Sequence, residues 1–425
     1  MSFGAMKAIK VSESDNLLVA LQNLTTGETI ETKGGGITIR NPVSAKHKIA
    51  ATDIGIGEKA FMYGVLVGEA TRPIFKGERI TTDNLIHRSS EYHNNQKREN
   101  WKAPITPNWE QKSFLGYQRT DGKVGTANYW LVVPMVFCEN GNVEVLRRSM
   151  TKALGFDQRS QYENFADELA KAYQQGDSPA AVQLPQENTN RPSPIFPNID
   201  GVKFLTHGLG CGETRGVSHE LCGLLAGYAC NPNVAGITIL SLGCQHAQVS
   251  IMEEEISKRC ANFDKPFLVF EQQKYPSERE MLEKAIRQTF ENLAEINKTG
   301  RTAAPLSKLC LGMECGASDG FSGISANPCI GQVADLTVGL GGRVILSEFP
   351  ELCGVEQEIV NRCESREIGD RFIEIMRNYE ERVKEAGSGF HMNPSPGNVQ
   401  DGLITDAIKS AGADGKGGPS PVVDV

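Results

Sequence analysis

The first part of the chain, residues 7–86, alternates short hydrophobic runs with turns, a pattern typical of short β-strands and hairpins. A Gly-Glu pair recurs in three of these turns, at residues 27–28, 57–58 and 77–78, and each pair lies between two hydrophobic segments. This repetition predicts a compact all-β module. The polar residues that follow, 88–112, contain few aliphatic side chains and are expected to form a linker or a surface arm.

The rest of the chain alternates apolar runs with small or polar loops and amphipathic stretches. Continuous apolar runs are typical of strands covered on both faces, and they predict strands at residues 129–137, 201–205, 235–242 and 266–270. Helical patterns are found at residues 143–154, 161–173, 217–229, 246–260 and 277–297. The sequence therefore predicts an α/β fold class, with a small all-β N-terminal module before a larger α/β domain that contains a mostly parallel sheet. The expected boundaries are 1–90 for the module, 91–112 for the linker and 113–425 for the larger domain.

Residues 309–328 combine an apolar run, a loop of small and polar residues and the start of a further helix. The loop contains Cys315, Ser318 and Asp319. Asn327 is a suitable N-cap residue, because a proline follows it at the first helical position. A loop between a strand and a helix presents backbone N–H groups at the edge of a parallel sheet, where anions bind well.

The composition limits the classes of function. At 425 residues the chain is long enough for two or three domains with a large core. The net charge of −8 argues against general binding to nucleic acid or to a membrane surface. No stretch reaches the roughly 20 apolar residues of a membrane span, and residues 1–10 lack an apolar signal core, so we expect a cytoplasmic protein.

Eleven cysteines are spread along the chain without a Cys-x-x-Cys motif. In a reducing compartment a cysteine is a buried thiol, a metal ligand or a nucleophile, and packing as a small apolar side chain is its ordinary role. Four cysteines share one position, just after a predicted strand and before its helix: Cys138, Cys211, Cys244 and Cys315. If the strands form one parallel sheet, these loops leave it at the same edge and the four thiols can line a metal centre.

The kind of metal stays open at this point. Thiolates select soft or borderline metals and iron–sulfur clusters, but the spacing is not that of a zinc finger, a zinc ribbon or a ferredoxin. The competing interpretation is a mononuclear Fe²⁺ or Mn²⁺ site, with nitrogen ligands from His47 or His207 and oxygen ligands from Asp121, Glu139 or Asp319.

Several segments together resemble the altronate/galactarate dehydratase family of sugar-acid dehydratases. The matching segments are Gly116-Tyr117 through Arg119, Asp121-Gly122, Gly125-Thr126 and Asn128; His207 with Gly210-Cys211-Gly212; Asn231-Pro232-Asn233 with Leu242-Gly243-Cys244; Cys315-Gly316 with Ser318-Asp319-Gly320-Phe321-Ser322-Gly323 and Ala326-Asn327-Pro328; and Asn393-Pro394-Ser395-Pro396-Gly397-Asn398. The front module resembles the family's SAF (β-clip) domain, with His47-Lys48 and Tyr63-Gly64 at matching places.

The chain departs from the family pattern at three places. Gln245 stands where the family often has Glu, and Cys353-Gly354 replaces a more usual Tyr-Gly. The family also continues beyond the position of Val425 with a further Gly-rich segment, so we expect this chain to lack that segment.

The resemblance implies a hydro-lyase of hexuronate catabolism that converts D-altronate to 2-keto-3-deoxy-D-gluconate and water with Fe²⁺ or Mn²⁺. Such a reaction removes the proton at C2, beside the carboxylate, and the hydroxyl at C3, so it needs a base, an acid and concentrated positive charge. A divalent metal would supply that charge as a Lewis acid. The expected partner is a small sugar acid rather than nucleic acid or a membrane, and the expected assembly is a homo-oligomer.

The resemblance also implies roles for particular residues. The predicted acid/base residues are His47, His207 and Asp319. The predicted substrate ligands are Lys48, Arg119, Ser318 and Asn327. The predicted metal-binding residues are Cys138, Cys211, Cys244 and Cys315, with an iron–sulfur cluster as an open alternative.

Other functions remain to be weighed. The same fold would serve a galactarate dehydratase or a sulfolactate sulfo-lyase, and a non-catalytic sugar-acid-binding protein is an alternative of a different class. A nicotinamide dehydrogenase is disfavoured, because no Gly-x-Gly-x-x-Gly follows a predicted strand with an acidic residue about 20 positions later.

Overall fold

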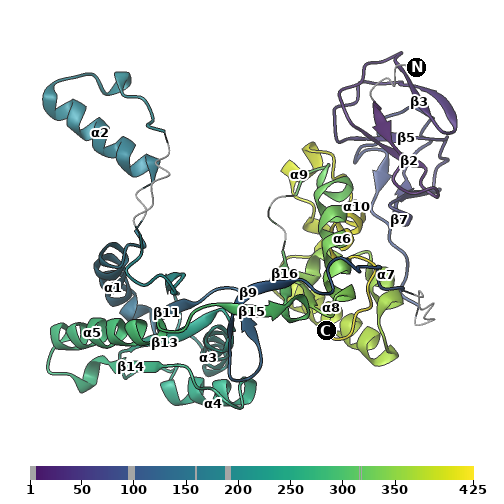
Figure 1. Ribbon diagram of the computed structural model, residues 1–425. Helices are drawn as coiled ribbons and strands as arrows, with labels where there is room; N and C mark the ends of the chain where they lie inside the picture. The colour runs from purple at the N-terminus through teal and green to yellow at the C-terminus, as the bar shows by residue number, and fades with distance from the viewer. Residues whose placement is uncertain (1–5, 94–100, 158–159, 187–192, 315, 317) are drawn as a thin grey trace. The chain divides into compact units, whose positions relative to one another are not determined.

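A computed structural model describes residues 6–93, 101–157, 160–186, 193–314, 316 and 318–425 (Figure 1). The chain forms two compact units, one made of Met1–Lys112 with Leu306–Val425 and the other of Ser113–Pro305. The predicted fold class is confirmed: a small N-terminal β module precedes α/β structure that contains a parallel sheet. Among the described helices, none is long and apolar enough to cross a membrane.

The N-terminal module consists of short antiparallel strands. Its three small sheets contain β1 (Ala8–Ile9), β2 (Leu17–Ala20) and β5 (Lys48–Ala50); β3 (Thr29–Thr32) and β4 (Gly35–Thr38); and β6 (Lys59–Met62), β7 (Val65–Ala70) and β8 (Leu85–Ile86). Strand β2 is buried on both faces, because Leu17 and Val19 join one hydrophobic core and Leu18 and Ala20 join another.

The Gly-Glu turns have the repeated geometry that the sequence predicts. In each turn the glutamate carboxylate accepts the backbone N–H three residues earlier, at 3.0 Å for Glu28, 2.6 Å for Glu58 and 3.0 Å for Glu78. The preceding glycines have positive φ, which other residues rarely adopt. At Gly77 a Cβ atom would lie 2.0 Å from the carbonyl oxygen of Thr38, so this turn also requires glycine for space.

The C-terminal part of the first unit is mostly helical. Strands β16 (Cys310–Met313) and β17 (Arg343–Leu346) pair in a two-stranded parallel sheet, and α6 (Ala326–Gly339) connects them. The later helices are α7 (Glu356–Arg362), α8 (Arg366–Glu385), α9 (Pro396–Gln400) and α10 (Asp406–Asp414). Short 3₁₀ turns lie at Ser322–Ile324, Phe349–Leu352, Phe390–Met392 and Gly415–Gly417.

The β module and the segment before and within α10 share one hydrophobic core. Leu403, Ile404, Ala407 and Ile408 are buried in the same cluster as residues of β2, β6 and β7 (Figure 1). The hydroxyl of Thr405 donates to the carbonyl oxygen of Val67 at 2.8 Å and accepts the N–H of Ile408, so it holds the start of the helix against β7. Residues more than 300 positions apart therefore form one folded body.

A buried lysine lies at the same contact. Lys48 is 0% exposed, and its amine donates to the carbonyl oxygens of Gly402 at 2.7 Å and Lys46 at 3.1 Å. Burial lowers the pKa of Lys48 to about 7, although the carboxylates of Asp401 and Asp319 act in the opposite direction. A neutral amine has two N–H groups, which matches the two carbonyl acceptors.

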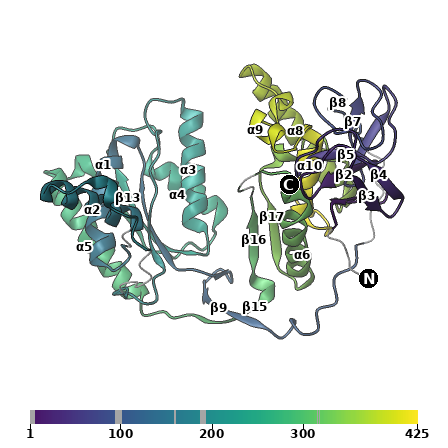
Figure 2. The same ribbon diagram turned by 90° about the horizontal axis from the view of Figure 1, so that it is seen from above.

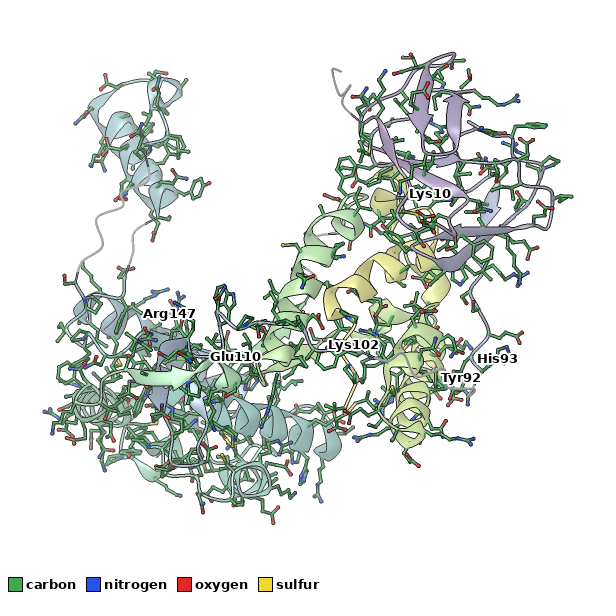
Figure 3. All side chains as sticks on the ribbon, turned by 45° about the vertical axis from the view of Figure 1, so that its right-hand side comes forward. Lys10, Tyr92, His93, Lys102, Glu110 and Arg147 are labelled. Carbon is green, nitrogen blue, oxygen red and sulfur yellow. The ribbon has the colours of Figure 1, made fainter. Side chains whose placement is uncertain are left out.

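The described parts of the expected linker pack against the C-terminal helices. The hydroxyl of Tyr92 donates to Asp370 on α8 at 3.1 Å, and the backbone N–H of His93 donates to Gln357 on α7 at 2.7 Å (Figure 3). Further along, the indole of Trp101 donates to Asp335 on α6. Where it is described, this segment is an arm bound to the first unit.

The second unit is built on a parallel sheet with the strand order β12-β11-β13-β14. These strands are β11 (Tyr129–Pro134), β12 (Gly201–Phe204), β13 (Val234–Ser241) and β14 (Phe267–Glu271). Helices α1 (Asn140–Ala153) and α5 (Glu278–Ile296) cover one face, and α3 (Arg215–Cys230) and α4 (Val249–Arg259) cover the other (Figure 2). The other elements of this unit are α2 (Gln161–Gln175) and 3₁₀ turns at Phe137–Glu139, Pro179–Ala181 and Gln272–Lys274. An antiparallel sheet is formed by β9 (Ser113–Gln118), β10 (Val124–Gly125) and β15 (Thr302–Pro305), and a further 3₁₀ turn, Leu306–Lys308, belongs to the first unit.

Strand β11 shows why a continuous apolar run predicts a central strand. Leu131 and Val133 join the core beneath α3 and α4, whereas Trp130 and Val132 join the core beneath α1 and α5. Successive side chains point to opposite faces, so a strand covered on both faces needs apolar residues at every position.

The shared core predicts a large effect of one substitution at the start of α10. Ile404→Ala should lower the free energy of unfolding by about 2–5 kcal/mol, because it leaves a cavity in the core that joins the two parts of the first unit. Urea denaturation measures the loss, and amide hydrogen exchange in β7 should rise with it. Ile105→Ala, at a side chain that is 93% exposed, is the matched control and should leave stability within about 0.5 kcal/mol. Equal stability of both variants would contradict the shared core.

The buried Lys48 amine predicts a pH-dependent stability. Between pH 7 and about 10 the unfolded chain binds a proton at this lysine and the folded chain does not, so Lys48 makes stability rise with pH. Urea denaturation at several pH values should therefore show that the unfolding free energy of the wild type rises relative to that of Lys48→Met as the pH rises. The slope is at most about 1.4 kcal/mol per pH unit. A constant difference would mean that Lys48 keeps its proton when folded.

Candidate active site

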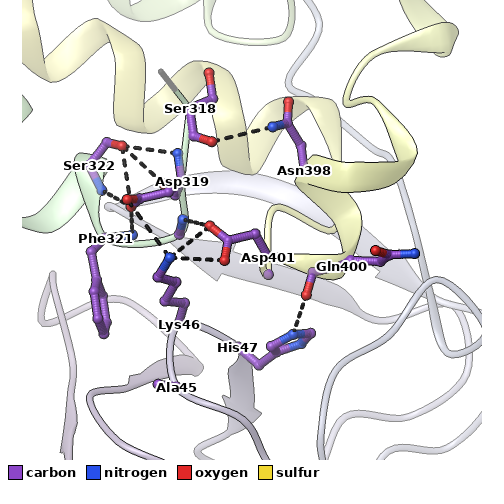
Figure 4. Close-up of polar contacts among 12 residues, drawn as sticks. Ala45, Lys46, His47, Ser318, Asp319, Phe321, Ser322, Asn398, Gln400 and Asp401 are labelled. Carbon is purple, nitrogen blue, oxygen red and sulfur yellow. Dashed lines mark hydrogen bonds and ion pairs between the residues drawn. The ribbon is translucent and has the colours of Figure 1, made fainter. Parts of the chain in front are cut away.

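The loop between β16 and α6 is folded around the carboxylate of Asp319. Its Oδ1 atom accepts the backbone N–H groups of Phe321 at 2.6 Å and Ser322 at 3.0 Å (Figure 4). Partial burial raises the pKa of Asp319, but the bond from Phe321 and the nearby Lys46 ammonium outweigh it, and the net pKa lies below the ordinary value. Asp319 is therefore a carboxylate at neutral pH.

Lys46 connects this loop to the α9–α10 connection. Its ammonium lies 2.9 Å from one oxygen of Asp401 and 3.8 Å from Asp319, and the other Asp401 oxygen accepts the N–H of Gly320 at 3.2 Å (Figure 4). The bond to Asp401 raises the pKa of Lys46. Lys46 has a φ of 75°, a region that non-glycine residues rarely adopt and that is often found near functional sites.

The predicted acid/base residue His47 is held from the same side. Its Nε2 atom lies 2.9 Å from the carbonyl oxygen of Gln400, so Nε2 carries the proton (Figure 4). Its Nδ1 atom is buried and has no hydrogen-bond partner within the described part of the chain. Burial lowers the pKa of His47, although the Gln400 carbonyl opposes the shift, which leaves a neutral ring. His47 lies behind the Asp319 loop and is not among the described residues that line the cavity below.

A cavity of about 210 Å³ opens beside the Asp319 loop, entirely within the first unit. Polar and charged side chains from the β module, the Asp319 loop, α6 and the later C-terminal segments line it: Tyr63, Glu314, Ser318, Asp319, Ser322, Asn327, Glu351, Lys409 and Lys416. Ile330, Leu403 and Ile408 supply apolar wall. The predicted residues Ser318, Asp319 and Asn327 are thus brought together, and a small polar acid fits the chemistry of this lining.

Two lysines, Lys409 and Lys416, line the cavity together with the carboxylates of Glu314, Asp319 and Glu351. Lys416 is 3% exposed, and its ammonium lies 2.8 Å from Glu351. Lys409 donates to the side-chain oxygen of Asn393 at 2.9 Å. An ammonium in a partly desolvated wall attracts a ligand carboxylate more strongly than one in water, because the local dielectric is low.

Tyr63 reaches the cavity from the β module. A Cβ atom on Gly323 would lie 2.3 Å from the Tyr63 hydroxyl, so glycine at that position in the loop allows the tyrosine to approach. Burial raises the pKa of Tyr63, so its hydroxyl stays protonated and can donate a hydrogen bond. Like Lys46, Tyr63 has a positive φ, of 57°.

Asn327 differs from its predicted capping role. Helix α6 begins at Ala326 with Ser325 as its N-cap, and the Asn327 amide donates to the carbonyl oxygen of Gly412 at 2.8 Å. This tertiary contact with the last turn of α10 takes the side chain away from the terminus of α6. Ser318 accepts a bond at its carbonyl oxygen from Asn398, at 3.3 Å (Figure 4).

Sequence reasoning missed Tyr63, Lys409 and Lys416 as site residues. One signal was present for the lysines: both occur in residues 403–418, which are otherwise mostly small or apolar. A charged residue in such a segment is expensive to bury without a purpose. Nothing in the sequence pattern shows that this segment returns to the β module.

Three further predicted residues, Arg119, His207 and Lys48, make hydrogen bonds to other parts of the protein. Arg119 donates to the carbonyl oxygen of Pro232 at 2.7 Å and to Asn128 at 2.9 Å. His207 lies 2.8 Å from the carbonyl oxygen of Pro134 through Nε2 and accepts the N–H of Leu209 at Nδ1, so both ring nitrogens have partners. The predicted substrate ligand Lys48 is the buried amine described above. Substrate or proton-transfer roles for these three stay predictions.

The expectation that four cysteine loops leave one sheet is corrected by the sheet topology. Cys138, Cys211 and Cys244 follow β11, β12 and β13, which are neighbours in one parallel sheet, and all three are exposed. The loop of Cys315 follows β16, which pairs with β17 in a separate sheet of the other unit, and Cys315 itself lies outside the described residues. The sequence could not separate the sheets, because each strand–loop–helix unit has the same local pattern.

No metal-binding cluster is assembled by the described residues: among them, no group of three or more His, Cys, Asp and Glu side chains could hold a metal ion. The cysteine ligand set therefore stays a prediction.

Comparison with known protein families covers most of the chain. The family model for the altronate/galactarate dehydratase SAF domain matches residues 6–88. The model for the second domain of D-galactarate dehydratase/altronate hydrolase matches residues 116–297, and the model for the C-terminal part of D-galactarate/altronate dehydratase matches residues 306–425. The match to residues 116–297 lies within the unit Ser113–Pro305, and the other two matches lie within the first unit.

Individual relatives match over almost the whole chain. Altronate dehydratase of Bacillus subtilis is 28% identical over 98% of this chain and 75% of its own length. Altronate dehydratase of Escherichia coli is 26% identical over 99% of this chain and 76% of its own length, and galactarate dehydratase (L-threo-forming) of the same organism is 26% identical over 98% and 73%. Together with the three family matches, these similarities show that the chain belongs to the altronate/galactarate dehydratase family of dehydratase enzymes.

Proposed function

We propose that the protein removes water from a sugar acid in the cavity beside the Asp319 loop, with D-altronate as the substrate. The observation that carries the proposal is the convergence of two lysines, a tyrosine hydroxyl and an amide on one small cavity. Two of the relatives named above are altronate dehydratases, which supports this choice of acid.

The reaction requires two bonds to break. A base removes the proton from C2, and the electron pair left behind forms a double bond to C3 as the C3–O bond breaks. The departing hydroxyl takes a proton and leaves as water, and the enol becomes a 2-keto-3-deoxy acid. Since the substrate already carries a carboxylate, loss of the C2 proton creates a second negative charge that the site must stabilise.

The cavity residues suit these requirements. We assign the Lys416 ammonium, which forms an ion pair with Glu351 and lines the cavity, to the substrate carboxylate. The Tyr63 hydroxyl and the Asn327 amide can bond the sugar hydroxyls, although the amide already donates to Gly412. Asp319 holds the loop through its backbone bonds, and its low pKa makes it a weak base, so we assign it to orientation of the loop and of substrate hydroxyls.

A divalent cation, Fe²⁺ or Mn²⁺, remains part of the proposal. It would supply Lewis-acid stabilisation of the carboxylate charge. The protein ligands are not assembled among the described residues, so the steps above are assigned to side chains of the chain alone. The substrate carboxylate and 2-hydroxyl would complete any coordination, and Cys315, next to the cavity residue Gly316, is the nearest of the predicted thiolates in sequence.

Turnover on a panel of sugar acids tests the proposal. Formation of a 2-keto-3-deoxy acid should be fastest with D-altronate, measured with galactarate, other hexonates and sulfolactate beside it. A preference for galactarate would change the substrate within the family, and the absence of keto-acid formation from every acid under metal-loaded, reducing conditions would overturn the dehydratase assignment.

Tyr63→Phe tests the cavity itself. The ring packing is kept and one hydrogen-bond donor is lost, so kcat should fall by about 10²-fold while the unfolding midpoint stays near that of the wild type. Tyr379→Phe on α8 is the matched control and should keep full activity. Wild-type kcat for Tyr63→Phe would place the reaction outside this cavity.

Metal removal tests the cofactor. Anaerobically purified protein should contain iron or manganese, and chelation should abolish turnover until Fe²⁺ or Mn²⁺ is returned. If the Cys315 thiolate is a ligand, metal content should fall in Cys315→Ser. If the thiols of the second unit are ligands, metal content should fall in the variant that combines Cys138→Ser, Cys211→Ser and Cys244→Ser. Unchanged metal content in both variants would exclude the thiolates as ligands.

A further inference from the structure

A polar relay connects the cavity to a buried carboxylate that the proposed chemistry does not use. The amide of Asn393 donates from Nδ2 to Asp406 at 2.9 Å, and its Oδ1 atom accepts from the Lys409 ammonium, also at 2.9 Å. Lys409 lines the cavity, whereas Asp406 is 5% exposed and is not among the described lining residues. An amide that must donate to a carboxylate and accept from an ammonium has one orientation only, so Asp406 sets the orientation of Asn393.

The helix that carries the two charged ends is held firmly. Asp406 is the first residue of α10, and Lys409 lies three positions later on the same face. The N-cap Thr405 is bonded to Val67 in β7, and Ile408 is buried in the shared core. The relay therefore stands on backbone that has little freedom to move, and the direction of the Lys409 side chain is decided mainly by Asn393.

The elements packed around Asp406 contribute further titratable groups. Cys353 precedes α7 and bonds the carboxyl, Glu356 on α7 repels it, and Lys409 attracts it. Glu380 on α8 acts on both Cys353 and Glu356, and the ring of His87 accepts the N–H of Ala407. Burial raises the pKa of Asp406 to about 7, against the opposing effects of Cys353, Asn393 and Lys409. Asp406 thus changes charge near neutral pH.

We propose that Lys409 is a catalytic residue that gives its proton to the departing C3 hydroxyl, and that Asn393 and Asp406 are positioning residues that aim it. The inference rests on the proposed dehydration. When the C3–O bond breaks, its electron pair stays on oxygen, which takes a proton from the Lys409 ammonium and leaves as water. The C2 proton goes to a separate base, and the neutral Lys409 amine regains a proton from solvent after the product departs.

A substrate whose leaving group needs no proton tests the role of Lys409. Lys409→Met and Lys409→Arg should each lower kcat on the hydroxy acid by about 10²-fold or more, because neither side chain can give up a proton at neutral pH. On the 3-deoxy-3-fluoro analogue, where fluoride leaves, the loss should be under about 10-fold. Equal losses on both substrates, or full activity of Lys409→Arg, would show that Lys409 serves only as a charge and would overturn the proposal.

The positioning residues are tested by a different readout. Asn393→Ala should lower kcat with little change in KM, because it removes the group that aims the proton donor. Asp406→Asn removes the carboxylate that orients the Asn393 amide, so it should likewise lower kcat with little change in KM. Wild-type kcat in both variants would overturn the positioning role. The controls are Asn361→Ala on α7 and Lys258→Met on α4, which should retain wild-type kinetics.

One measurement separates failure of the relay from failure of the proposed function. The side-chain amide signals of Asn393 in protein labelled with ¹⁵N-asparagine report the relay without turnover. They should shift in Lys409→Met and in Asp406→Asn but not in Lys258→Met. If the signals shift but the protein turns over no sugar acid, the contacts of Asn393 are supported and the catalytic role of Lys409 is overturned. If the enzyme is active but the signals do not shift, only the relay through Asn393 is overturned.

Discussion

The structure of the first unit depends on one contact, the packing of residues 401–408 into the β module. Apolar side chains before and within α10 complete a core that the short strands cannot close by themselves. Polar groups at the rim fix the register: Lys46 binds Asp401, the Lys48 amine bonds Gly402, and Thr405 bonds Val67. Because burial of apolar area has no directional preference, these bonds decide how the segment is oriented on the core.

The candidate active site is a consequence of that contact. The cavity takes Tyr63 from the β module, the Asp319 loop from the strand–helix unit and two lysines from α10 and the turn after it. None of these segments forms the cavity alone, and the rare backbone conformations of Lys46 and Tyr63 lie where the module meets the loop. Strain of this kind persists only where surrounding contacts compensate for it, which the shared core does.

Charge in this unit is distributed according to burial. Asp319, bonded by backbone N–H groups, stays ionised, whereas Asp406, deeper and surrounded by other acids, shifts toward neutrality. The two carboxylates therefore differ in what they can do at neutral pH, and the difference comes from their surroundings rather than from their chemistry. Lys409 and Lys416 both line the cavity, and each has a side-chain partner: Asn393 for Lys409 and Glu351, also in the cavity wall, for Lys416.

Features that depend on neighbouring residues could be predicted before the fold was known: the β module with its Gly-Glu turns, the central strands of the parallel sheet, and the Asp319 loop between a strand and a helix. The sequence also identified Ser318, Asp319 and Asn327 as neighbours in one site, since they belong to a single motif. Only the tertiary structure decided that residues 306–425 return to the β module, that Cys315 follows a different sheet from Cys138, and that Lys48 is buried while Lys409 faces the cavity. Contacts between residues several hundred positions apart leave no periodic signal in the chain, because they depend on which surfaces remain uncovered after the local elements have formed.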